Sequence, residues 1–214
     1  MLSKFTKNKN TFVFLYFEIC VKLCDLFGCV YYPTKIQFMR KLKLDELNRL
    51  STADFKQAEK TPIIVVLDNI RSAANVGSVF RTCDAFLVKA IYLVGICATP
   101  PNREIQKSAL GATETVEWVY FETIEHCINQ LKTDKYSILA IEQSDASVFL
   151  HDFLPDEEQN FASVFGNEVD GVSDFVMQQC DACIEIPQFG MKHSLNIAVA
   201  AGIIIWDFTR KLRL

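Results

Sequence analysis

Three polar segments of this chain contain side chains that can bind a ligand or a substrate, and each directly follows an apolar run. DNIRSAAN (68–75) follows TPIIVVL, GNEVDG (166–171) follows FASVF, and QFGMKHSLN (188–196) follows CIEIP. Arg81 lies a short distance beyond the first segment. Carboxylate, amide, hydroxyl and guanidinium groups accept and donate hydrogen bonds, and a guanidinium binds phosphate as a fork. The three segments are therefore candidates for one binding site.

Several common active-site patterns are absent from the sequence. There is no GxGxxG after an apolar run and no GxxxxGK[ST], so neither a dinucleotide fold nor a P-loop is indicated. No GxSxG occurs, and the histidines are His126, His151 and His193, which disfavours a hydrolase triad; His126 is expected on the surface of a helix. The one CxxC, at 180–183, lacks a second ligand pair, so we expect free thiols and no metal site among the eight cysteines.

Composition indicates a globular protein with one good core. The chain has 214 residues, 50% of them hydrophobic and 22% charged, and a net charge of −4, which on average disfavours a nucleic-acid partner unless cations gather locally. The aromatic-rich stretch 11–32 is interrupted by Glu18, Lys22 and Asp25, so no membrane span is expected. Free thiols are typical of a reducing compartment, so a cytoplasmic protein is predicted. Residues 1–38 are interpreted as an appendage or a mis-assigned start, 39–60 as a lead-in helical segment, and 61–214 as the functional domain.

Hydrophobic periodicity predicts alternating strands and helices. Strands are predicted at 61–68, 90–95, 116–121, 136–142, 161–166 and 183–187, and helices at 41–55, 75–87, 103–110, 124–131, 173–180 and 195–212. This alternation is typical of an α/β fold with a parallel sheet covered on both faces. Ligands of such sheets bind beyond the carboxyl ends of the strands, where the three polar segments begin.

Three ordered blocks resemble the SpoU (TrmH-like) branch of the SPOUT RNA methyltransferases. They are NVGSVFRT (75–82), FGNEVDGVS (165–173) and IPQFGMKHSLNIAVAAGI (186–203), and the resemblance extends from about residue 61 to the C-terminus. One departure is Leu87, where that family often has glycine; we interpret it as a change of packing at a helix end.

The resemblance implies an S-adenosylmethionine-dependent 2′-O-methyltransferase of tRNA or rRNA, with a C-terminal trefoil knot that forms the cofactor pocket. It also implies a homodimer. Backbone groups of three loops hold the cofactor in that family, and glycines at 166 and 190 suit a close approach to it. The matching positions are Glu142, Gln143, Gly166, Asn167, Ile186, Ser194, Leu195 and Asn196.

The same resemblance assigns catalytic roles to Arg81, Asn75, Glu168, Ser194 and Asn196. Family mechanisms often treat the arginine as the base, but a guanidinium stays protonated in proteins, so a clamp on a phosphate is the alternative. Asn75 is expected to cap its helix or to orient Arg81. Gly77, one turn before Arg81, is expected to leave room for a substrate nucleotide.

A surface that binds RNA phosphates is also expected. Its candidates are Arg71, Arg103, Lys107, Lys192 and Arg210, the last within the basic tail RKLR at 210–213. Two other interpretations stay open: a knotted RNA-binding protein without transfer activity, and a different small-molecule enzyme on a doubly wound sheet. The short segment between Met39 and the first strand favours tRNA over rRNA.

Overall fold

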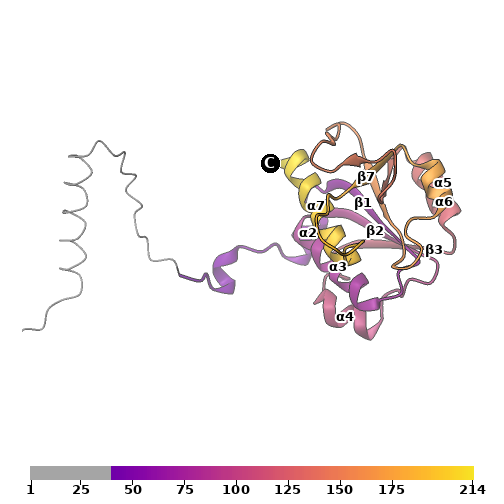
Figure 1. The fold of residues 1–214 in the computed structure, drawn as a ribbon. Coiled ribbons are helices and arrows are strands. Elements are labelled where there is room, and N and C mark those ends of the chain that lie inside the picture. Colours follow the sequence, from indigo (N-terminus) through magenta and orange to yellow (C-terminus); the bar gives the residue numbers. More distant parts are fainter. Residues whose placement is uncertain (1–39) are drawn as a thin grey trace, which may run out of the picture. The chain divides into compact units, whose positions relative to one another are not determined.

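The computed structural model describes residues 40–214. The chain divides into two compact units, and the boundary between them in the sequence lies between Asn48 and Arg49. The described part of the first unit contains the 3-10 helix η1 (Leu44–Leu47), where Glu46 accepts hydrogen bonds from Arg40 and from the Lys43 amide. The second unit, Arg49–Leu214, contains the sheet and all other helices of the described residues (Figure 1). The predicted appendage at 1–38 and the predicted start at Met39 lie outside the described residues.

The single helix predicted over 41–55 is wrong. Two short helices occur instead, η1 and α2 (Thr52–Gln57). Asn48 ends η1 in a left-handed conformation with φ 46°, and Ser51 is extended and starts α2 by accepting a hydrogen bond from the Asp54 amide. The left-handed backbone of Asn48 and the extended backbone of Ser51 both interrupt a continuous helix, although the apolar spacing continues across them.

Within residues 40–214, seven parallel strands form one sheet, in the order β3-β2-β1-β6-β4-β7-β5. Their bounds are β1 (Thr61–Asp68), β2 (Val88–Val94), β3 (Glu117–Phe121), β4 (Ser137–Ile141), β5 (Val148–Phe149), β6 (Phe161–Phe165) and β7 (Ala182–Glu185). The predicted α/β fold with a parallel sheet is thereby confirmed. The sequence did not indicate β5, because two exposed residues carry no periodicity. The trefoil knot stays a prediction.

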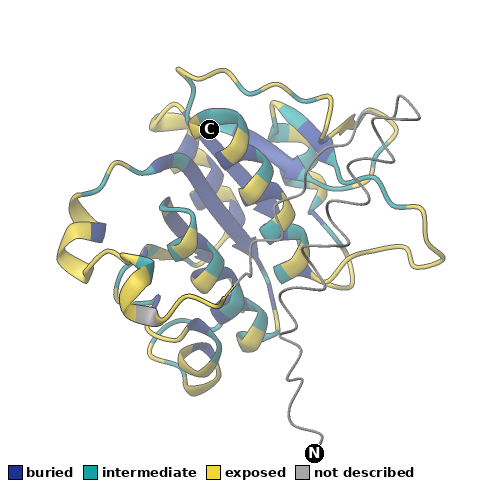
Figure 2. Cartoon of the chain, turned by 90° about the vertical axis from the view of Figure 1, so that its left-hand side faces the viewer, coloured by how far each residue is buried: buried dark blue, intermediate teal, exposed yellow. Residues whose placement is uncertain are grey.

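Helices cover both faces of the sheet. On one face lie α2, α3 (Ala73–Ala85), α4 (Arg103–Ala109) and α7 (Ile197–Arg213); on the other lie α5 (Ile124–Thr133) and α6 (Asp174–Gln179). Figure 2 shows the strands buried between helices whose outer sides are exposed. Within residues 40–214, no helix combines the length and the apolar content that crossing a membrane requires.

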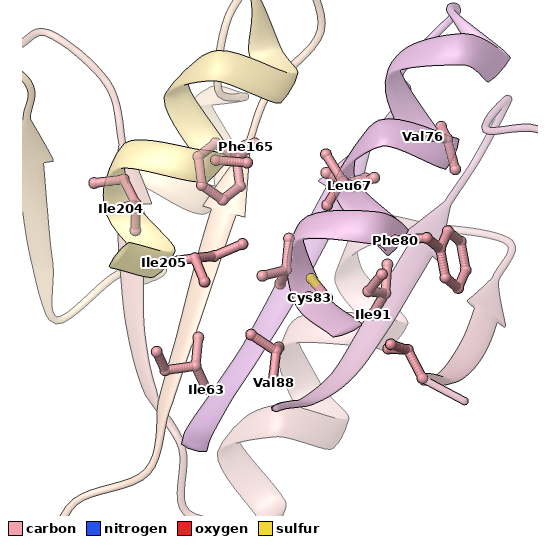
Figure 3. Close-up of a cluster of buried hydrophobic side chains, with 14 of the residues drawn as sticks. Ile63, Leu67, Val76, Phe80, Cys83, Val88, Ile91, Phe165, Ile204 and Ile205 are labelled. Atoms are coloured by element: carbon pink, nitrogen blue, oxygen red, sulfur yellow. The ribbon is translucent and has the colours of Figure 1, made fainter. Parts of the chain in front are cut away.

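The larger core holds α3 and α7 against the sheet. Val76, Phe80 and Cys83 of α3 are fully buried on the predicted apolar stripe, and Ile204 and Ile205 of α7 pack in the same cluster (Figure 3). Complete burial of such side chains stabilises the fold by about 1.5–3 kcal/mol each relative to exposure. This core fixes the amino ends of α3 and α7 beside the carboxyl ends of the strands.

One residue of α3 was interpreted wrongly from the sequence, and a second, just after the helix, has an unusual backbone. Gly77 is buried, and a Cβ there would lie 2.1 Å from the Ser108 Oγ and 2.5 Å from the Ile105 carbonyl oxygen, so this glycine lets α4 approach α3 and leaves no space for a nucleotide. Leu87 has a left-handed backbone, with φ 52°. Glycine adopts that conformation without strain, so the departure from the family concerns the backbone conformation as well as packing, and the Leu87 side chain packs against the larger core.

Asp68, at the end of β1, is expected to make stability depend on pH. The residue is 4% exposed, and burial raises the pKa of its carboxyl, partly opposed by the hydrogen bond of 2.7 Å from Asn69. Because the pKa of Asp68 is higher in the folded than in the unfolded protein, its protonated carboxyl stabilises the fold. This contribution is complete below the pKa of the unfolded chain, about 3.9, and is lost as the pH rises through the pKa of the folded protein. Asp68→Asn should therefore raise the free energy of unfolding at pH 7 relative to the wild type.

Urea unfolding of both proteins between pH 3 and pH 7 measures this effect. The gain should vanish at the acidic end of the series, and exposed Asp145→Asn serves as the matched control. An equal gain at every pH would contradict the assignment to Asp68.

Candidate active site

Three loops surround a pocket of about 620 Å³ at the carboxyl ends of β4, β6 and β7. Its apolar lining includes Ile141, Phe165, Ile184, Ile186, Leu195 and Ile197, and its polar lining includes Glu142, Gln143, Asn167, Glu168, Asp170, Gln188, His193, Ser194 and Asn196. All eight residues assigned to the cofactor by resemblance line this one pocket. Mixed apolar and polar walls of this size suit a small organic ligand.

Glu142 braces two of the loops against each other. One carboxylate oxygen accepts a hydrogen bond of 2.8 Å from the Gln143 amide, and the other accepts one of 3.0 Å from the Val172 amide. The thiol of Cys183 donates to the Glu142 carbonyl at 3.4 Å, which adds β7 to the same junction. Both carboxylate oxygens have backbone partners, so the side chain supports the shape of the pocket.

Gly166 allows the second loop to close on itself. A Cβ at this position would lie 2.0 Å from the carbonyl carbon and oxygen of Gly171 and 2.2 Å from the Val172 nitrogen. The space that a side chain would need is thus filled by the chain's own backbone, while Gly166 itself lines the pocket; its close approach to the cofactor stays a prediction. Around Gly190, by contrast, no heavy atom of the described residues lies within 4 Å of where a Cβ would stand.

The third loop, residues 186–196, joins β7 to α7 and is held at its far end. Gln143 donates from Nε2 to the His193 carbonyl at 3.0 Å, and Asn196 caps α7 by accepting from the Ala198 amide at 2.9 Å. Neither the acceptor role of His193 nor the pocket lining by Gln188 was predicted. Both residues lie inside the third polar segment, and the length of that segment was the only sequence signal that further residues of it could line the site.

Asn75, Glu168 and Asn196 form a chain of hydrogen bonds beside the pocket. Asn196 donates from Nδ2 to Asn75 Oδ1 at 3.3 Å, and Asn75 donates from Nδ2 to Glu168 Oε1 at 3.5 Å, the limit for such a bond. The three residues come from three different elements. Asn75 does not cap its helix, because α3 begins earlier with Ser72 as its cap. Ser194 lines the pocket two residues before Asn196.

Arg81 lies apart from this chain of hydrogen bonds. It is exposed, and its guanidinium has no hydrogen bond or ion pair within residues 40–214. It follows Asn75 by six residues, which is about 240° around the helix axis, so the two side chains leave α3 in directions about 120° apart. Within one chain, the structure therefore does not bring Arg81 together with the other predicted catalytic residues.

The predicted RNA-contacting cations are all exposed, but the basic tail is partly structural. Arg71, Arg103, Lys107, Lys192 and Arg210 reach solvent, and Arg210 pairs with Asp207 at 2.9 Å. Lys211 is different: its side chain is 9% exposed and donates to the carbonyls of Leu150 and Phe153 at 2.6 and 2.7 Å. Lys211 therefore ties α7 to the turn after β5 and is no part of a phosphate-binding surface.

A second pocket, of about 670 Å³, lies near the amino-terminal halves of β1, β2 and β3. Lys56, Lys89 and Glu117 are among its lining residues. None of the predicted site residues lines it, and it lies away from the carboxyl ends of the strands. The pocket beyond β4, β6 and β7 is therefore the candidate active site.

The fold and this pocket define a class of α/β proteins that bind a small ligand in loops beyond a parallel sheet. The SpoU rRNA Methylase family model matches residues 62–206, and the chain belongs to that family. Over 150 residues it is 33% identical to the 23S rRNA (guanosine-2′-O-)-methyltransferase RlmB of Neisseria meningitidis, covering 70% of this chain and 59% of that protein. The chain thus spans about three fifths of that relative.

Solved structures with the same fold include two with related sequences. The A. aeolicus TrmH/SpoU tRNA modifying enzyme has a TM-score of 0.65 and 28% identity, covering 75% of this chain and 79% of that one. An AdoMet-bound rRNA methyltransferase from Sinorhizobium meliloti has a TM-score of 0.66 and 25% identity, covering 74% of this chain and 60% of that one.

Proposed function

We propose that this protein is an S-adenosylmethionine-dependent RNA methyltransferase that transfers a methyl group to a ribose 2′-hydroxyl of tRNA or rRNA. The observation that carries the proposal is the convergence of all eight predicted cofactor residues on one pocket, next to the hydrogen-bonded Asn75, Glu168 and Asn196. The names of the relatives, which describe rRNA and tRNA modification, support the same chemistry.

The donor groups of the pocket fit S-adenosylmethionine. Ile186, Leu195 and Ile197 offer apolar surface for an adenine ring, and the loop backbones at 166–167 and 194–196 offer amides and carbonyls for its polar edge. When bound, the cofactor supplies a methyl group on a sulfonium, which is electrophilic enough for transfer to an oxygen. Glu142 acts indirectly in this scheme, by holding two loops at the spacing that the cofactor requires.

The chain's own side chains then position the ribose and assist loss of the 2′-hydroxyl proton. The Glu168 carboxylate is exposed beside the pocket and can accept a hydrogen bond from the substrate in addition to the long one from Asn75. Arg81 binds an RNA phosphate as a fork, which brings the substrate to the cluster from another side of α3. A phosphate held in this way is a candidate acceptor for the proton.

A homodimer is part of this proposal. Val199, Ile203 and Trp206 follow one another at helical spacing on α7 and are 52%, 36% and 47% exposed, and Leu195 before the helix is 37% exposed. A stripe of large apolar side chains on a surface helix is typical of a subunit interface. In a dimer, two sets of the exposed cations Arg71, Arg103, Lys107, Lys192 and Arg210 would serve one RNA despite the net negative charge.

Two measurements test the function. Calorimetry with S-adenosylmethionine should show one site per chain, and no binding would exclude the enzyme. Transfer of a tritiated methyl group from the cofactor to bulk tRNA or rRNA should then be detected in nuclease-digested RNA as 2′-O-methylnucleoside. RNA binding without transfer would favour the inactive RNA-binding alternative, although the intact catalytic set argues against it.

Binding of bulk tRNA should also weaken steeply with salt, because phosphate contacts release counterions. Each phosphate neutralised adds roughly 0.9 to the slope of log affinity against log salt for a duplex. Charge-removing variants of Arg103 and Lys107 should each lower this slope by about one. A salt-independent affinity would contradict the proposed phosphate-binding surface.

A further inference from the structure

The loop that closes the pocket carries two large apolar side chains that point away from the protein. Phe189 is 98% exposed and Met191 is 85% exposed, both within residues 186–196. The neighbouring Gln188 and His193 line the pocket, whereas Phe189 and Met191 do not. These two side chains therefore stand at the mouth of the pocket, outside its walls.

The phenyl ring of Phe189 has both faces free within the described residues. Gly190 follows it, and no heavy atom lies within 4 Å of where a Cβ of Gly190 would stand, so the chain beside the ring leaves open space. Single exposed apolar residues are common, but aromatic side chains are enriched at binding interfaces relative to the rest of the surface. The loop is nevertheless anchored at both ends, by β7 and by the Gln143–His193 hydrogen bond.

We propose that Phe189 stacks on a nucleobase of the RNA substrate, at or next to the nucleotide whose ribose enters the pocket. This inference rests on the proposed function and adds a positioning residue to it. Aromatic side chains bind unpaired bases in this way, because every base has a flat π-face that becomes available for stacking once the base leaves a duplex or a folded loop. Met191, on the same loop, adds apolar surface beside the ring.

Charge on the loop favours RNA over a second copy of this chain as the occupant. Lys192 is exposed three residues after Phe189 and is the predicted phosphate contact nearest to it in the sequence. A cation on the same loop as an exposed aromatic ring suits a single strand, in which bases and phosphates alternate. The apolar stripe proposed for the dimer begins at Leu195 and continues along α7. Phe189 lies outside that stripe.

The experiment compares Phe189→Ala, Phe189→Leu and Phe189→Trp with the wild-type full chain. The probe is a single-stranded RNA of about twelve nucleotides with a central 2-aminopurine, whose fluorescence reports stacking, at one fixed salt concentration. A perfectly paired duplex of the same RNA is the control ligand. Leu154→Ala is the control variant, because Leu154 is 82% exposed and does not line the pocket.

Loss of the ring should weaken single-strand binding by about 5- to 150-fold in Phe189→Ala. Phe189→Leu should behave like the alanine variant, since it keeps apolar volume but no ring, and Phe189→Trp should bind within about twofold of wild type. Duplex binding should not change, and Leu154→Ala should match the wild type. In a methyl-transfer assay, Phe189→Ala should raise KM for RNA and leave the affinity for S-adenosylmethionine intact.

Three results would overturn the inference. They are an unchanged single-strand affinity in Phe189→Ala, a wild-type affinity in Phe189→Leu, and a change of sedimentation coefficient in Phe189→Ala that reveals a subunit contact. The proposed function is judged separately, by cofactor binding and methyl transfer in the wild type. A wild type that transfers methyl groups while Phe189→Ala changes nothing refutes the stacking alone.

Discussion

Gly166→Ala is expected to abolish cofactor binding, with the affinity for S-adenosylmethionine falling by at least about 100-fold. The new methyl group would meet backbone atoms of Gly171 and Val172 at 2.0–2.2 Å. A flexible side chain can move away from such a contact, but here two backbone segments must separate. Inserting a methyl group into a closely packed site costs about 1–3 kcal/mol, and more where backbone must move.

Separation of these segments also breaks the brace that Glu142 makes to the Val172 amide, so two of the three loops lose their spacing. Calorimetry with the cofactor and urea unfolding measure the two consequences. Gly190→Ala is the matched control, because its methyl group enters open space, and it should bind the cofactor within about twofold of the wild type. Equal behaviour of the two variants would show that the contact at Gly166 does not maintain the pocket.

Arg81→Lys is expected to lower kcat/KM for RNA methylation by about 100-fold or more, nearly as much as Arg81→Ala. A lysine keeps the positive charge but loses the planar fork that holds a phosphate by two bonds. Without this fork the ribose 2′-hydroxyl is held less accurately in line with the methyl group, and the rate of transfer falls. Because the Arg81 side chain is exposed and free of partners within residues 40–214, neither substitution should change the free energy of unfolding by more than about 0.5 kcal/mol.

The pH–rate profile of Arg81→Lys distinguishes the two possible roles of Arg81, as a clamp on a phosphate and as the base that removes the proton. If Arg81 removed the proton, lysine would restore much of the rate and would shift the profile, since an amine loses its proton more readily than a guanidinium. A clamp predicts a large loss with an unchanged profile. Arg103→Lys, on neighbouring α4, is the control: it should alter KM modestly and kcat not at all.

Much of the fold was predictable because each strand and helix carries its own pattern. Ile63 to Val66 form a β-branched run that indicates a buried strand, and Val76, Val79, Phe80 and Cys83 mark the buried side of α3. Strand order was not predictable from these patterns. A period of two determines which face a residue occupies, but it does not determine which strand lies beside it.

The errors concern residues whose role depends on a neighbour from another element. Gly77 looked free on its own helix, yet Ile105 and Ser108 of α4 occupy the space beside it. Lys211 looked like one cation of a basic tail, yet its ammonium binds two carbonyls of a distant turn. The site residues, in turn, were predicted from the resemblance of three sequence blocks. Hydrophobic periodicity alone indicates only that the segments containing these residues follow the ends of strands.

The place of β6 in the sheet has a consequence for how the chain folds as it is synthesised. β6 lies between β1 and β4, and β4 reaches β1 only through it. The three strands β3, β2 and β1 can pair as soon as residue 121 is made, whereas β4 has to wait for residues 161–165. Pairings of such long sequence separation are slow to form. We therefore expect a partly folded nascent chain with the unpaired edge of β1 exposed, and an active site that is assembled last.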